Sequence, residues 1–123
     1  MSDRAAVRVQ SLTFGTTGTS TAVASSATNT SNPIPLPRDD YTVQVTVETT
    51  GTSIGSGQVV WQTTNDMNSW LPQGTAAGTS TNAAGAGTAS YASAAVAITA
   101  KYAYGRGIVS GTGTSIVSAR VGS

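Results

Sequence analysis

The side chains able to do chemistry in this sequence are mainly hydroxyls and carboxylates, because the chain contains neither histidine nor cysteine. A His-based catalytic triad and a zinc site of imidazole or thiolate ligands are therefore excluded. Serine and threonine are abundant, but a hydroxyl nucleophile needs a base, and here the base would be Lys101 or a carboxylate. The composition thus predicts a protein that is not an enzyme and that carries no cofactor.

The acidic residues offer two further candidates for a site. Asp39 and Asp40 are adjacent, but neighbouring residues of a strand point to opposite faces, so we interpret them as turn polarity before a strand. Asp66 with Asn65 and Asn68 could supply oxygen ligands to a cation, although the alternation of a calcium loop is missing. The other reading is a tight turn at Asn65-Asp66, and we expect no metal. A hydrolase using Asp39 or Asp66 would lack a plausible base.

Charge is sparse in this chain of 123 residues, which has the length of one domain. Only 9% of the residues are charged and the net charge is +1, so neither a nucleic-acid partner nor a membrane surface is expected. The N-terminal residues alternate and are charged, unlike a signal peptide, and nothing approaches the length of a membrane-spanning helix. The six basic residues are dispersed, at Arg4, Arg8, Arg38, Lys101, Arg106 and Arg120.

Strand signals dominate, since strong helix formers other than alanine are scarce and Thr, Val and Gly abound. Alternation predicts strands at 5–14, 40–51, 58–66, 92–111 and 112–122. The best of them places Tyr41, Val43, Val45 and Val47 on one face. We expect a turn at 51–57, a short strand at 69–73 that stops at Pro72, and a long loop or poorly packed hairpin at 74–90.

These elements predict an all-β fold, an antiparallel β-sandwich of jelly-roll-like form with an extended N-terminal arm. Residues 1–38 would form a strand followed by the Gly/Ser/Thr- and Pro-rich arm, and residues 39–123 the sandwich core, within a single domain overall. The segment 15–32 could be a flexible arm or an edge strand with long loops. Removing residues 1–37 is expected to abolish assembly while leaving the core folded.

The two tryptophans flank a predicted hairpin turn. Trp61 is in phase with Val59 and is expected to anchor the core. Trp70 has polar neighbours, and two interpretations of it stay open. It could pack near Trp61 from the returning strand, or it could contact a ligand.

The segments "YTVQVTVETTG" and "GQVVWQTTNDMNSW" resemble those of small β-sandwich virion structural proteins of tailed bacteriophages. In that pattern Gln62, Asn65, Asp66 and Trp70 occupy positions of the second strand. Residues 101–121 look like the closing hairpin, with Tyr104 and Arg106 at its aromatic and arginine positions. The resemblance covers about residues 40–121.

The resemblance implies a capsid decoration (cement) protein or a neck or tail component, located in the virion and assembled in the host cytoplasm. Its partners would be other virion proteins, such as major capsid, neck or tail subunits, and it would form a homo-oligomer. The alternative is a carbohydrate-binding or adhesin-type module in which Trp70 and a tyrosine stack on sugar rings. The candidate interaction residues are Pro33, Pro35, Pro37, Trp70 and Arg106.

Overall fold

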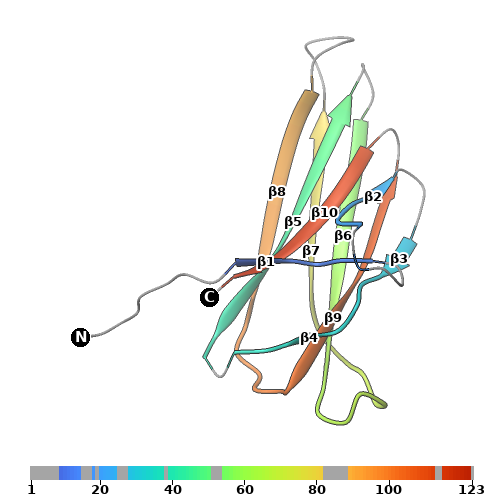
Figure 1. Ribbon diagram of the computed structural model, residues 1–123. Coiled ribbons are helices and arrows are strands. Elements are labelled where there is room, and N and C mark those ends of the chain that lie inside the picture. The colour runs from blue at the N-terminus through green and yellow to red at the C-terminus, as the bar shows by residue number, and fades with distance from the viewer. Residues whose placement is uncertain are drawn as a thin grey trace.

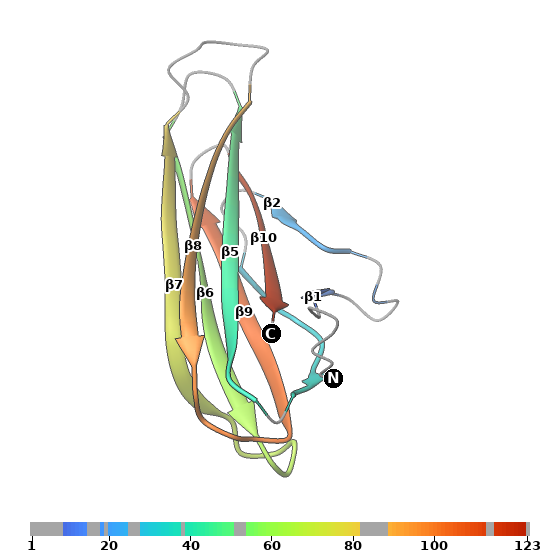
Figure 2. The same ribbon diagram turned by 90° about the vertical axis from the view of Figure 1, so that its left-hand side faces the viewer.

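The computed structural model describes residues 9–14, 18, 20–24, 28–37, 39–50, 54–81, 89–112 and 115–122, which contain strands and no helix. Figures 1 and 2 show two layers of long strands, with shorter N-terminal strands along one side. The strands are β1 (Val9–Ser11), β2 (Val23–Ala24), β3 (Thr28–Thr30), β4 (Ile34–Pro35), β5 (Tyr41–Thr50), β6 (Ile54–Thr64), β7 (Leu71–Thr81), β8 (Ala89–Ile98), β9 (Tyr104–Thr112) and β10 (Ser115–Gly122). The all-β prediction is confirmed.

The strands form two antiparallel sheets. In the β5 sheet the order is β8, β5, β10, and both β1 and β2 pair with the outer side of β10. In the β6 sheet the order is β7, β6, β9, and both β3 and β4 pair with the outer side of β9. From β5 onward the chain passes between the sheets in the order of a jelly roll, as the sequence predicted.

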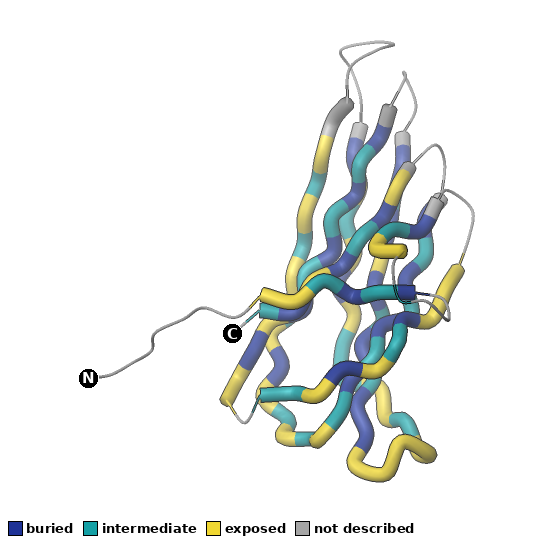
Figure 3. Tube along the Cα trace, in the orientation of Figure 1, coloured by how far each residue is buried: buried dark blue, intermediate teal, exposed yellow. Residues whose placement is uncertain are grey.

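The core lies between the sheets and follows the alternation seen in the sequence. The inward side chains of β5 are fully or almost fully buried, and their partners on β10 continue the same layer: Val43 pairs with Val121, Val45 with Ala119 and Val47 with Val117. Val59 and Trp61 supply the facing layer from β6. Figure 3 shows the resulting alternation of buried residues with more exposed ones along these strands.

The N-terminal stretch covers one side of the sandwich. Leu12, Phe14, Val23 and Ile34 belong to the buried core. These contacts argue against the expectation that the core stays folded without residues 1–37, because the truncation would remove core side chains. Pro35 pairs with Tyr104 at the sheet edge, where a residue without an N–H group is tolerated.

Several strand boundaries were not predicted from the sequence, because small residues there give no clear hydrophobic pattern. Much of the predicted loop at 74–90 is strand, since β7 continues past Pro72 to Thr81 and β8 begins at Ala89. Pro72 is accommodated because β7 is an edge strand and its register shifts between Trp61 and Gln62. Residues 54–57, assigned to a turn, open β6. The single strand expected at 92–111 is two strands, and β9 and β10 lie in different sheets, so they form no closing hairpin.

Trp61 is the largest fully buried side chain of the described residues, which confirms it as a core anchor. Its indole N–H donates a hydrogen bond to the Tyr41 hydroxyl at 2.8 Å, and the two rings meet edge to face at 6.2 Å between centroids. Space for the indole comes from β9, where Gly105 and Gly107 face inward. A Cβ atom on Gly105 would lie 2.2 Å from Cζ2 of Trp61.

Replacing Tyr41 by phenylalanine should weaken the fold at neutral pH and remove one source of alkaline sensitivity. Burial raises the pKa of Tyr41 above its ordinary value of 10.0, and the hydrogen bond from Trp61 opposes this only in part. A raised pKa means that the stabilisation is complete below about pH 10 and is lost as the pH rises through the folded-state pKa. At neutral pH the variant leaves the indole N–H unpaired, at a cost of about 1–3 kcal/mol.

The measurement is the unfolding free energy of both proteins from urea titrations at neutral pH and at several alkaline values. The difference between them should shrink as the pH rises above 10. A constant difference would contradict the role given to the Tyr41 phenol.

Candidate interaction site

The candidate site lies on the outer face of the β6 sheet, near the loop that joins β6 to β7 at the lower end of Figure 1. Arg106 of β9 points outward because its neighbours Gly105 and Gly107 face the core. Its guanidinium carbon lies 4.1 Å from the ring centroid of Trp70. Its Nε atom donates a hydrogen bond of 2.9 Å to Oε1 of Gln62, the residue paired with it across the strands.

The loop beside this stack is fixed by its own side chains. The Thr64 hydroxyl donates to Asp66 Oδ1 at 2.8 Å and accepts the backbone N–H groups of Asp66 and Met67. The same Oδ1 atom accepts the N–H groups of Asn68 and Ser69 at 2.9 and 2.8 Å. Met67 adopts a left-handed backbone conformation with φ of 61°, which this network holds. The chain reverses where the sequence predicted, but through the loop 65–70 rather than a tight turn at Asn65-Asp66. The Asn65 side chain accepts a hydrogen bond from the N–H of Ala103.

The carboxyl group of Asp66 should titrate well below an ordinary aspartate. Hydrogen bonds from the N–H groups of Ser69 and Asn68, followed by that from Thr64, lower its pKa from 3.8 to about 2. A lowered pKa means that the loop is stabilised above about pH 4 and loses this contribution as the pH falls through 2. In an NMR titration the Asp66 carboxyl carbon and the Asn68 and Ser69 amides should share a midpoint near 2. In the Asp66→Asn variant this titration should vanish, and a midpoint near 4 in the native protein would contradict the assignment.

The structure brings together two residues that the sequence had proposed separately. Trp70 and Arg106 form one stack, and Pro35 lies beside Tyr104, two positions before Arg106 on β9. Pro33 and Pro35 are exposed and Pro37 is half-buried. The expectation that Trp70 packs near Trp61 is wrong, because the ring of Trp70 lies against Arg106 on the outside of the sheet whereas Trp61 points inward to Tyr41.

The carboxylates suggested for catalysis are dispersed. Asp40 forms an exposed ion pair with Lys101, and Asp66 is engaged by its loop. Within the described residues no group of three acidic, histidine or cysteine side chains could hold a metal ion. Residues 51–55 have the spacing Gly-x-Ser-x-Gly of a nucleophile elbow, but that motif needs a helix after the serine, and here strand β6 begins at Ile54.

Several residues of this surface were missed from the sequence. Gln62 was noted only as part of a motif, and its hydrogen bond to Arg106 depends on pairing between β6 and β9. Met67 is 49% exposed in the loop between β6 and Trp70. The signal available in the sequence was that Arg106 stands between Gly105 and Gly107, so in a strand it lies on the face opposite these glycines.

The architecture defines the chain as a jelly-roll β-sandwich, and comparisons with known proteins add little to this class. No family model and no curated protein matches the sequence. Among solved structures, the SPBc2 prophage-derived protein YomS is similar with 16% identity and a TM-score of 0.45 over the whole of both chains. The Eiger TNF of S. frugiperda is similar with 14% identity and a TM-score of 0.47, over 94% of this chain and 90% of that one. Neither similarity bears on function. No helix in the described part of the chain is long and apolar enough to cross a membrane.

Proposed function

We propose that this protein is a non-enzymatic structural subunit of a bacteriophage virion, a capsid decoration protein or a neck or tail component, that acts through contacts between subunits. The virion assignment is supported by the sequence resemblance of residues 41–51 and 57–70, whereas the closing hairpin expected at 101–121 is not formed. The assembly role is supported by one feature of the fold, the contrast between the two sides of the sandwich.

One side is covered and the other is open. Strands β1 to β4 pair with β9 and β10 along one side, whereas in the described structure β7 and β8 each pair with a single neighbour. These two edge strands are long and contain no charged residue, and proline occurs in them only at Pro72. Monomeric proteins usually protect such edges with charges, prolines or short strands. An unprotected pair of edges fits pairing with a second copy of the chain.

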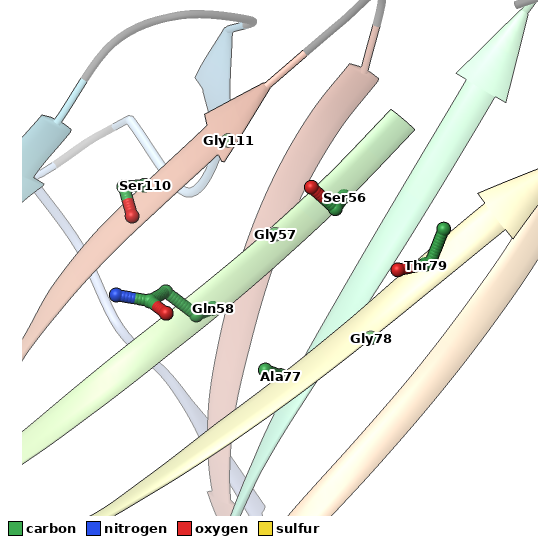
Figure 4. Close-up of a pocket in the computed structure, with 8 residues that line it drawn as sticks. All are labelled: Ser56, Gly57, Gln58, Ala77, Gly78, Thr79, Ser110 and Gly111. Carbon is green, nitrogen blue, oxygen red and sulfur yellow. The ribbon is translucent and has the colours of Figure 1, made fainter. Parts of the chain in front are cut away.

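The surface next to the β7 edge is also suited to close approach. A shallow depression of about 430 Å³ crosses the outer face of β6, β7 and β9, and Figure 4 shows the small uncharged residues that line it. The longest of these side chains is Gln58; the others include Ser56, Ala77, Thr79 and Ser110. Another subunit could therefore lie against this face without displacing charged side chains.

The experiment is the mass of the protein in solution, by light scattering, for the native chain and a variant with Ala77→Lys and Ala95→Lys. Both alanines are exposed, one on each edge strand, so the lysines add the charges that block edge pairing. The native chain should be oligomeric and the double variant should be smaller. Thr42→Lys is the matched control, since Thr42 is exposed on the central strand β5.

A native chain that stays monomeric at all concentrations would contradict the edge contact. The virion assignment has its own test in the genes that neighbour this one. Capsid or tail genes would support it, and a set of metabolic genes would count against it.

Carbohydrate binding is the second candidate, and Tyr91 is the observation that favours it. This residue is 65% exposed on the outer face of β8, opposite Glu48 of β5. It lines a groove of about 270 Å³ that also includes Arg120. Trp70 is less suited to stacking because the guanidinium of Arg106 lies over its ring. A glycan array should then show binding that Tyr91→Ala removes and Trp70→Ala retains, and an array without any binding would eliminate this candidate.

A further inference from the structure

We propose that Arg106, held between Trp70 and Gln62, is a docking site for a carboxylate side chain that stands next to an apolar residue on a partner protein. This inference rests on the proposed function for the nature of the partner, and its chemistry comes from the site alone.

The guanidinium group is oriented by two contacts. Stacking on Trp70 sets its position against a ring face, and the bond from Nε to Gln62 occupies one donor. An arginine carries five N–H donors, so the four on its terminal nitrogens are left to meet an acceptor. Within the described structure the side chain of Arg106 contacts Gln62 through a hydrogen bond and Trp70 through stacking. The group is thus arranged in advance, which lowers the cost of ordering it on binding.

Charge points to an anion as the ligand. Arg106 is half-buried and has no carboxylate partner among the described residues. The ion pair formed by those residues joins Lys101 to Asp40. The adjoining loop contains Asp66, whose Oδ1 atom is occupied by Thr64 and by two backbone N–H groups. A planar carboxylate matches the fork of an arginine with two parallel hydrogen bonds. The π face of Trp70 holds the guanidinium in the stack while the edge of the guanidinium binds the carboxylate.

An apolar rim adds the second part of the recognition. Met67 is exposed on the loop that leads to Trp70, and its backbone N–H is held by Thr64. Leu71 takes no part, because it pairs with Thr63 and so lies on the face opposite Arg106. Tryptophan and arginine are the residues most often found at the energetic centres of protein interfaces, surrounded by contacts that exclude water. Because the Thr64 and Asp66 network holds the loop, Met67 and Trp70 are displayed without a large loss of conformational entropy. A carboxylate with an apolar neighbour would bind Arg106 through the carboxylate and contact the apolar side chain of the loop through its neighbour.

The probe for this proposal is a blocked tripeptide, N-acetyl-Leu-Glu-Leu-amide, with its glutamine analogue as the reference ligand. Binding to the full chain is followed by NMR at the Arg106 Nε–H and the Trp70 indole N–H signals. Saturable shifts are expected with the glutamate peptide and not with the glutamine one. Arg106→Gln should weaken binding by about tenfold or more, as expected for losing charge-assisted hydrogen bonds.

Two further variants keep the result interpretable. Arg106→Lys retains the charge but loses the fork, so it should also weaken binding while preserving the fold. Arg120→Gln makes the same charge change on the outer face of the other sheet and should leave binding unchanged. Equal binding of both peptides, no saturable shift, or inorganic phosphate binding in preference to the glutamate peptide would overturn the proposal. Mass measured on the same samples separates this result from the edge contact, since either can fail alone.

Discussion

Replacing Trp61 by alanine is expected to lower the unfolding free energy by about 3–5 kcal/mol, because it empties the largest fully buried position of the described core. The loss has three sources. Apolar area is no longer buried, a cavity opens between Val59 and the glycines of β9, and the Tyr41 hydroxyl loses its donor. Native domains are stable by only about 5–15 kcal/mol, so the variant should be close to unfolding.

The measurement is a urea titration followed by far-ultraviolet circular dichroism, which does not depend on tryptophan fluorescence. Trp70→Ala is the matched control. Trp70 lies on the outer face, and its contact with Arg106 should contribute about 0.5–1 kcal/mol. If the two variants lost the same stability, or if Trp61→Ala lost less than about 1 kcal/mol, the assignment of Trp61 as the core anchor would be wrong.

The sequence predicted the strands whose two faces differ in polarity. In 41–47 valine and tyrosine alternate with threonine and glutamine, and the structure buries the expected residues. The same reasoning failed at 74–81, where Gly, Ala, Ser and Thr occupy both faces and leave no hydrophobic contrast to detect, and it missed residues 89–91 at the start of the next strand. Both segments are nevertheless strands, because they pair with β6 and β5. Recognising them as strands requires knowing which other strands they pair with, and local sequence patterns do not give that information.

The candidate site shows the same division between local and distant information. The chain reversal at 65–70 follows from side-chain to backbone bonds within a few residues, and its position could be predicted. The stack of Trp70 on Arg106 joins residues far apart in the chain, and it depends on the pairing of β6 with β9. The register shift after Trp61 adds a residue to β7, so simple alternation could not place Trp70 relative to Trp61. Trp70 and Arg106 were each candidates from the sequence, but their contact with one another could not be predicted without the strand pairing.

Replacing Gly105 by alanine is the second substitution with a large expected effect, although it adds a single methyl group. The added Cβ would lie 2.2 Å from Cζ2 of Trp61 and 2.9 Å from its Cε2 and Cη2 atoms. The indole cannot easily withdraw, because it is fully buried and bonded to Tyr41. Overpacking of this kind costs about 1–3 kcal/mol and occasionally more. We expect a loss at or above the upper end of that range.

Gly78→Ala is the matched control, since its Cβ would meet the Ala94 Cβ atom at 3.9 Å, an ordinary contact. A double-mutant cycle with Trp61→Leu identifies the cause. If Gly105 exists to admit the indole, the alanine should cost much less beside the smaller leucine, with a coupling energy above about 1 kcal/mol. Additive losses would mean that Gly105 is needed for another reason. Coupling would show that the alternating glycines of β9, which resemble a flexible loop in composition, are the complement of Trp61 in the core.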